Sequence, residues 1–177
     1  MQCWGHTCLV LLRTAQPTDA VAVAEVHVRS WQRGYVGLLP DEHLDALRAE
    51  DRAQHYTFGD SNPLTPATIV AIEAEAICGF ATIGASRDRD REGSGELLAL
   101  YVDPDRWGLG IGRTLIEEAR SRLVHQGYTS ASLWVLDGNQ RAERFYVIDG
   151  WEPDGARRRD QIAGVAVDEI RYARSLT

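Results

Sequence analysis

The sequence predicts a single-domain α/β (α+β) fold, with a mixed, mostly antiparallel sheet of about seven strands and about four flanking helices. The first observation is length, because 177 residues are enough to bury one core without disulfides or metal. The second is the order of periodic segments: strand, two helices, three strands, helix, strand, helix and two strands. The third is a helical segment between apolar strands at 96–102 and 131–136, which predicts one parallel pair.

The first half of the chain is predicted to supply a strand, two helical stretches and a hairpin. Pro17-Thr18-Asp19 and Pro40-Asp41-Glu42 each combine proline with acidic residues, as is typical of the first turn of a helix. The expected elements are a strand at 9–13, a helix from 17 to about 33, a broken helical stretch from 40, a loop at 60–66, and hairpin strands at 68–74 and 76–85.

The second half contains the predicted centre of the sheet. The expected elements are a solvated connection at 86–95, a central strand at 96–102, the main helix at 110–126, a strand at 131–136, a short helix at 139–148, and closing strands at 151–157 and 167–173. The connection is predicted to be solvated because arginines alternate with acidic residues in it. The main helix has apolar residues at helical spacing that should face the core: Ile111, Leu115, Ile116, Ala119 and Leu123.

A glycine-rich turn, Asp-Arg-Trp-Gly-Leu-Gly-Ile-Gly-Arg at 105–113, joins the central strand to the main helix. Its three glycines let the backbone pass close to a ligand, and the first amides of the helix lack partners within it. Such a turn favours phosphate or pyrophosphate. The P-loop and dinucleotide patterns both fail, since the chain has no lysine and either Arg113 or Leu115 stands at the last glycine position. A tight turn without a ligand is the alternative, but it needs only one glycine.

The turn resembles the pyrophosphate-arm signature Gln/Arg-x-x-Gly-x-Gly/Ala of the GNAT superfamily of acyl-CoA-dependent N-acetyltransferases, laid on Trp107 to Gly112. Family members carry a second segment like N-x-x-A-x-x-F/L-Y-x-x-x-G-F, which is matched in order and spacing by Asn139, Ala142, Phe145, Tyr146, Gly150 and Trp151. The resemblance covers about 96–151 and implies a sheet whose central parallel strands splay apart. Trp107 departs from the expected Gln or Arg, so main-chain amides should carry the phosphate contacts, with Arg106 or Arg113 adding charge.

The resemblance implies an acetyl-CoA site across the splayed strands. The pyrophosphate would bind the amides of 108–113, the pantetheine arm would bond to the central strand like an added strand, and Asn139 would hold the arm from the other side. The cofactor-binding residues expected on this basis are Leu100, Tyr101, Val102, Trp107, Gly108, Leu109, Gly110, Ile111, Gly112, Arg113, Asn139 and Tyr146.

Two catalytic residues follow from the same resemblance. Tyr146 would protonate the leaving thiolate, which suits a phenol whose pKa lies near that of an alkyl thiol. Glu96 occupies the place where many relatives carry a glutamate that takes the proton of the attacking amine, often through water. Strand alternation, unless a bulge changes its phase, puts Glu96 on the face of Leu98, Leu100 and Val102. Weaker candidates for the base are Glu73, Asp149 and His27.

A two-step reaction through Cys78 and a metal-assisted reaction are both disfavoured. No histidine stands near Cys78 in sequence, and a free cysteine in a strand is usually a small core residue. The histidines at 6, 27, 43, 55 and 125 show no metal-ligand spacing, so no metal is predicted. Direct transfer from acetyl-CoA is therefore expected.

The acceptor should be read by the helices at about 17–58, mainly by 31–40. Trp31 and Tyr35, four residues apart, form either a wall for a cationic amine or part of the core. A small-molecule or peptide amine is expected, and polyamine, aminoglycoside, amino acid, peptide N-terminus and protein lysine all remain open. There are two alternatives to an enzyme. One is a noncatalytic acyl-CoA sensor, but the presence of both Asn139 and Tyr146 argues against it. The other is a protein that binds a different phosphate ligand, such as a nucleotide.

Composition limits the partners and the location. A net charge of −7 offers no basic excess for nucleic acid. Three cysteines without C-x-x-C spacing fit a reducing compartment. The sequence shows no secretory signal and no apolar run of the length of a membrane span. A cytoplasmic protein without nucleic-acid or membrane partners is expected, and a homodimer is left open.

Overall fold

The computed structural model describes residues 10–60, 62, 65–162 and 164–177. Seven strands form one sheet in the order β1-β2-β3-β4-β5-β7-β6. All neighbouring strands are antiparallel except β4 and β5, which are parallel, so the predicted mixed sheet is confirmed. The strands are β1 (Leu11–Thr14), β2 (Ala67–Glu73), β3 (Ala76–Ala85), β4 (Gly95–Val102), β5 (Ser130–Leu136), β6 (Glu152–Ile162) and β7 (Val165–Ser175).

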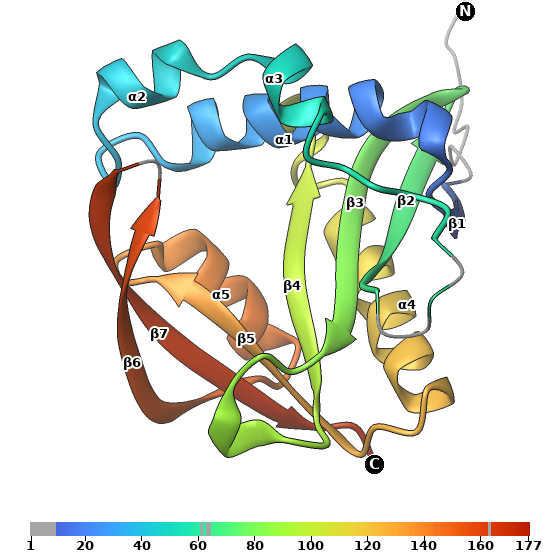
Figure 1. Ribbon diagram of the computed structural model, residues 1–177, viewed down its shortest axis with the longest axis vertical. Helices are drawn as coiled ribbons and strands as arrows, with labels where there is room; N and C mark the ends of the chain where they lie inside the picture. Colours follow the sequence, from blue (N-terminus) through green and yellow to red (C-terminus); the bar gives the residue numbers. More distant parts are fainter. Residues whose placement is uncertain (1–9, 61, 63–64, 163) are drawn as a thin grey trace, which may run out of the picture.

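Five α-helices flank the sheet in the described part of the chain: α1 (Ala20–Gly34), α2 (Asp41–Ala46), α3 (Ala49–Ala53), α4 (Ile111–His125) and α5 (Gln140–Ile148). The fifth helix arises because the broken stretch after Pro40 divides into α2 and α3. Figure 1 shows α1, α2 and α3 together across one end of the sheet, with the β6–β7 hairpin on the flank opposite β1.

Two of the three apolar clusters in the described part of the chain lie on opposite faces of the sheet. The predicted core-facing residues of α4 are all buried, and they pack with β4 residues such as Leu97 and Val102. On the other face, Val23 and Val26 of α1 pack with Phe80 of β3, and Tyr101 of β4 borders this cluster. β4 therefore contributes side chains to both cores, as expected for the central strand.

The hairpin turn and the last two strands differ from what the sequence signals indicate. Ala74 and Glu75 form the β2–β3 turn with φ of 48° and 66°, values that normally favour glycine or asparagine, so the sequence carries no turn signal at this hairpin. The final strands extend beyond the predicted 151–157 and 167–173. β6 is a mostly exposed edge strand, so its continuation lacks the apolar alternation that identifies a strand.

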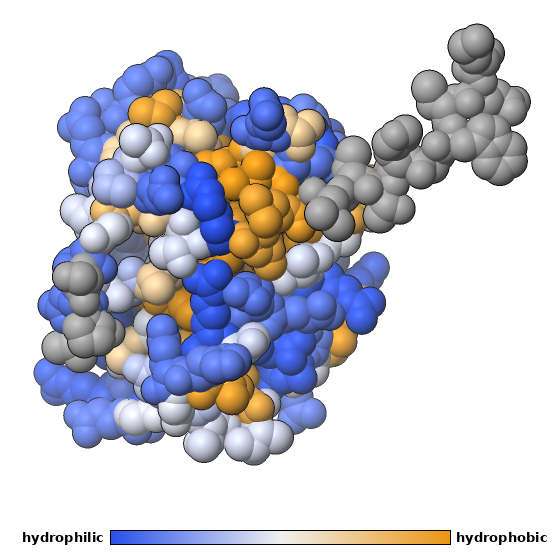
Figure 2. Space-filling model, turned by 90° about the vertical axis from the view of Figure 1, so that its right-hand side faces the viewer, coloured by the Kyte–Doolittle hydropathy of each residue, from blue (hydrophilic) through white to orange (hydrophobic). Residues whose placement is uncertain are grey.

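The opposite edge of the sheet is short. Figure 2 views the side of the molecule that carries β1 and shows a group of hydrophobic residues bordered by hydrophilic ones. Leu11 of β1 and Val21 of α1 are exposed apolar side chains. β1 has four residues, and its Arg13 is held by Asp19 at 2.6 Å. A short strand with a charged side chain is poorly suited to pairing with another chain.

Candidate active site

A cleft opens where β4 and β5 separate. Across their fully described lengths, the two strands pair only at Gly95 with Ala131 and at Glu96 with Ser132. The splayed parallel pair expected from the sequence is therefore confirmed. The cleft beyond these pairs has a volume of about 1050 Å³ and is lined by both strands, α1, the glycine turn and α5. Backbone groups on the facing edges of the strands are thus available to an extended ligand.

The glycine turn is built for a close backbone approach. Gly108 and Gly110 have φ of 80° and 86°, and a Cβ added to either would meet no atom within 4 Å. Gly110 is the N-cap of α4, so the unpaired amides of the first turn follow directly. Gly112 has another role, because an added Cβ would lie 3.4 Å from Phe145. The open space and the amides fit a pyrophosphate.

The arginines around the glycine turn differ in how readily each could bind a phosphate group. Arg106 is ion-paired with Glu73, whereas Arg113 is 81% exposed and pairs with Glu117 at 2.9 Å. A surface pair of this kind contributes little and exchanges readily. Of the two arginines that the sequence suggested for the phosphate charge, Arg113 is the one free to turn toward a ligand. Exposed Arg144 of α5 also lines the cleft.

Trp107 organises the floor of the cleft through its side chain. Its indole Nε1 donates to the carbonyl oxygen of Val102 at 2.7 Å, and Ser30 Oγ donates to the same oxygen at 2.8 Å. The guanidinium of Arg141 lies 3.1 Å from the centroid of the indole ring. Since a carbonyl oxygen has two lone pairs, both acceptor positions of Val102 are occupied. A ligand can use the N–H of Val102 but not its carbonyl.

Tyr146 and Asn139 line the α5 side of the cleft. The Tyr146 side chain is 9% exposed and packs edge-on against Phe145 and Trp151, with ring centroids 5.2 and 6.4 Å away. Burial raises the pKa of Tyr146 well above its ordinary value, so the phenol keeps its proton at neutral pH. Asn139 Oδ1 accepts from the Ala142 amide at 3.2 Å and caps α5. The side-chain NH₂ of Asn139 is the group left for a ligand.

A bulge in β4 decides where Glu96 points. Thr82 pairs with Ala99 and Ile83 pairs with Leu97, so Leu98 is an extra residue in β4. Leu97 consequently faces the α4 core, and Glu96 lies on the opposite face, the face of Tyr101. The expectation that Glu96 shares a face with Leu100 and Val102 is wrong because of this bulge.

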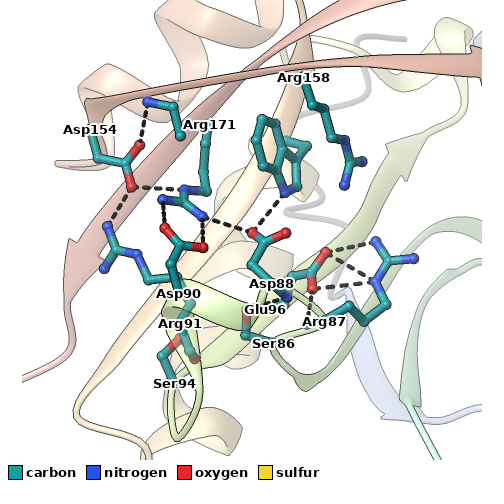
Figure 3. Close-up of polar contacts among 12 residues, drawn as sticks. Ser86, Arg87, Asp88, Asp90, Arg91, Ser94, Glu96, Asp154, Arg158 and Arg171 are labelled. Atoms are coloured by element: carbon teal, nitrogen blue, oxygen red, sulfur yellow. Dashed lines mark hydrogen bonds and ion pairs between the residues drawn. The ribbon is translucent and has the colours of Figure 1, made fainter.

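Glu96 is fully buried and held by Arg87. It is 1% exposed, and its oxygens accept from the Arg87 amide at 2.9 Å and from Arg87 Nη2 at 2.7 Å. Figure 3 shows this clamp from the loop before β4. The carboxylate faces the cleft from β4, so Arg87 fixes its orientation there. Sequence reasoning did not single out Arg87.

The loop before β4 is largely exposed, as the sequence predicted, with Arg87, Arg89, Asp90 and Glu92 open to solvent, but distant strands bind part of its charge. Arg171 of β7, 6% exposed, binds Asp88 at 3.1 Å, Asp90 at 2.5 Å and Asp154 at 2.8 Å, and Figure 3 shows it among these carboxylates. Trp134 Nε1 of β5 donates to Asp88 at 3.0 Å. Arg91 of the loop also pairs with Asp154 of β6. The segment that carries Arg87 is thereby anchored to β5 and β7.

The weaker candidates for the base are committed elsewhere. Burial, reinforced by nearby Arg52, lowers the pKa of His27 to about 3, so its imidazole is a poor base at neutral pH. Glu73 is paired with Arg106. Asp149 is held by Arg120 and Arg174 and accepts from Trp151 Nε1. Glu73 and Asp149 also do not line the cleft, whereas Glu96 does, so Glu96 remains the candidate base although it too is ion-paired, with Arg87.

Cys78 has the surroundings of a core residue. Its side chain is 4% exposed and its Sγ donates to the Ala71 carbonyl at 3.3 Å. Burial raises the pKa of the Cys78 thiol, which disfavours the thiolate needed for nucleophilic attack. In the described ranges, no group of three or more His, Cys, Asp and Glu side chains is placed to hold a metal ion. No helix described there is long and apolar enough to cross a membrane.

A splayed parallel pair, a glycine turn at the start of α4 and a buried phenol across the cleft form an arrangement that fits an acyl-CoA-dependent transferase. Residues 20–151 match the Acetyltransferase (GNAT) family, and the chain belongs to this family. It is similar to an uncharacterised N-acetyltransferase, YuaI, of Bacillus subtilis, with 29% identity over 163 residues that cover 92% of this chain and 91% of the relative. The protein is thus an N-acetyltransferase that uses acetyl-CoA as co-substrate.

Two further likenesses are more distant. A spermidine N(1)-acetyltransferase of Thermoplasma acidophilum is 23% identical over 145 residues, covering 80% of this chain and 87% of the relative. The crystal structure of the PaiA N-acetyltransferase of Thermoplasma acidophilum in complex with coenzyme A has a TM-score of 0.72 at 20% identity, covering 94% of this chain and 99% of that chain. The structural likeness supports the same fold.

Proposed function

We propose that the protein transfers an acetyl group directly from acetyl-CoA to a primary amine within a ternary complex. The acceptor is a small molecule or a peptide. The observation that carries the proposal is the cleft itself, where the glycine turn before α4 and Tyr146 of α5 face one ligand space between β4 and β5.

The proposed roles in binding follow from the groups left free. Amides of 108–113 hold the pyrophosphate, with Arg113 supplying charge. The edge of β4 at Leu100, Tyr101 and Val102 bonds to the pantetheine arm, and the NH₂ of Asn139 bonds from the opposite side. The Trp107 side chain holds the Val102 carbonyl in place, and the Trp107 backbone forms part of the turn that binds the cofactor. The core of this site is 96–151, and the helices at about 17–58 form the acceptor side.

The proposed chemistry is one nucleophilic substitution at the thioester carbonyl. The neutral amine attacks, so that a C–N bond forms and the C–S bond breaks. A main-chain N–H near Val102 stabilises the developing oxyanion. Glu96, directly or through an ordered water, takes the proton of the amine, and Tyr146 gives a proton to the leaving thiolate.

A noncatalytic acyl-CoA sensor is the second candidate. Such a sensor needs the glycine cradle but neither an acid nor a base. The protonated phenol of Tyr146 and the oriented carboxylate of Glu96 in one cleft favour the enzyme. A cytoplasmic location is also proposed, since the described Cys78 is a free thiol and free thiols persist in reducing compartments.

Calorimetric titration with CoA, acetyl-CoA, ATP and NAD tests the binding part of the proposal. We expect CoA and acetyl-CoA to bind in the micromolar range, and ATP and NAD to bind far more weakly, because only the CoA esters have a pantetheine arm for the edge of β4. Binding of ATP equal to or tighter than that of CoA would contradict the assignment. CoA binding without acetylation of any amine in a broad panel would favour the sensor.

A further inference from the structure

The acceptor end of the cleft is formed by α1, α3 and β4. His27, Trp31 and Tyr35 of α1 and Arg52 of α3 line it together with Tyr101 of β4. The rings of His27 and Tyr101 lie 4.7 Å apart, and the hydroxyls of Tyr35 and Tyr101 lie 3.2 Å apart. This aromatic wall resembles a cage for a cation. The polar groups beside it, however, are hydrogen-bond donors, and these favour an anionic group.

Two hydrogen-bond donors at this end have no partner. Trp31 Nε1 and Arg52 Nε are both buried and unpaired within the described ranges. No carboxylate of those ranges forms an ion pair with Arg52. A buried donor without a partner is costly, and a charged one more so. A ligand that brings an anionic acceptor would satisfy both groups.

The carboxylates that line the cleft are all ion-paired with arginines. The described residues that line it include three acidic side chains: Glu96, Asp160 and Glu169. Glu96 is paired with Arg87 at 2.7 Å, and Arg158 pairs with Glu169 at 2.6 Å and with Asp160 at 3.6 Å. A polyamine would find no unpaired carboxylate among these groups. Arg52 is left as a positive charge without a counterion.

The two unpaired donors belong to residues that line the same cleft as Tyr146. Tyr101 of β4 lines it as well, and the ring centroids of Trp31 and Tyr101 lie 6.5 Å apart. An acceptor bound there can place a carboxylate against Arg52 and Trp31 within the same ligand space that Tyr146 faces.

We propose that the acceptor is a small amine that carries a carboxylate, as an amino acid does, and that Arg52 and Trp31 bind this carboxylate. The inference rests on the proposed acetyl transfer and adds the class of acceptor to it. The amine then points toward the thioester, and the aromatic wall packs against the rest of the acceptor. A guanidinium suits this task because it can bind a carboxylate with two parallel hydrogen bonds.

Matched acceptors provide the first test. Amino acids are compared with their amides, with the corresponding amines that lack the carboxylate, and with spermidine, by measuring release of free CoA thiol. We expect at least one amino acid to be acetylated with a kcat/KM about 10- to 100-fold above that of its amide, as for loss of a charge-assisted hydrogen bond. Turnover of amides, simple amines or spermidine that equals or exceeds that of every amino acid overturns this inference but leaves acetyl transfer intact. No turnover with any amine overturns both.

Variants at Arg52 provide the second test. Arg52→Gln should raise KM for the best amino acid about 10- to 100-fold, abolish its advantage over the amide, and leave acetyl-CoA affinity unchanged, whereas Arg52→Lys should restore part of the preference. The matched control is Arg159→Gln, a 75% exposed arginine of β6 that does not line the cleft, which should change none of these values. An unchanged ratio of amino acid to amide in Arg52→Gln would exclude Arg52 as the carboxylate ligand. Circular dichroism shows that the variants compared are folded.

Discussion

Replacing Gly110 with valine is expected to abolish binding of CoA and acetyl-CoA while the chain still folds. The Gly110 backbone has a φ of 86°, which costs a residue with a side chain about 1–2 kcal/mol. The added atoms would also project into the open space in front of the first amides of α4, the place proposed for the pyrophosphate. Calorimetry with CoA, at a temperature where circular dichroism shows a folded chain, measures the loss.

Gly127→Val is the matched control for this change. Gly127 follows α4, has a φ of 93°, and would place a Cβ in equally open space, but it is not part of the cleft. The control should lose stability through the same backbone strain and keep its affinity for CoA. If Gly110→Val bound CoA as the wild type does, the pyrophosphate would have to bind elsewhere.

Tyr146→Phe is expected to lower kcat by about 10- to 1000-fold with little change in affinity for acetyl-CoA. The substitution removes the proton donor proposed for the thiolate and keeps the ring that packs against Phe145 and Trp151. Steady-state kinetics at saturating amine, together with calorimetry for acetyl-CoA, separates the two effects.

Tyr172→Phe controls for loss of a buried phenol. Tyr172 is 3% exposed and bonds to Glu143 at 3.3 Å, outside the cleft. This variant should lose some stability and keep its kcat. A kcat of Tyr146→Phe equal to that of the wild type would assign Tyr146 to packing alone.

Local signals in the sequence were sufficient to predict the helix, the turn and the parallel strands that position the site. The apolar spacing of α4 identified its buried face, from Ile111 to Leu123, because helix periodicity is a property of adjacent turns. The glycines at 108 and 110 identified the turn because positive φ restricts which residues fit. The strand–helix–strand order around them predicted the parallel pair, and the family resemblance predicted its splay.

Features that depend on distant pairing were not predictable in this way. The bulge at Leu98 exists only through the register of β4 against β3, yet it turns Glu96 to the other face. Arg171 binds Asp88 and Asp90, which are more than 80 positions away in sequence, so the local pattern of this exposed loop did not reveal its anchoring to β7. The isolation of Arg52 likewise becomes visible only when the carboxylates around the cleft are seen to be paired with other arginines.

Direct transfer of the acetyl group from acetyl-CoA to the amine can be tested by intact-mass spectrometry, because the chain contains no lysine. No ε-amine can accept an acetyl group, so incubation with acetyl-CoA alone should leave the mass unchanged, apart from slow acetylation of the α-amine at Met1. Addition of an amine acetylated in the panel should then release free CoA thiol in equal amount to the acetylated product, with no acyl-enzyme. An acetyl group on Cys78 that passes into product at the turnover rate would contradict direct transfer.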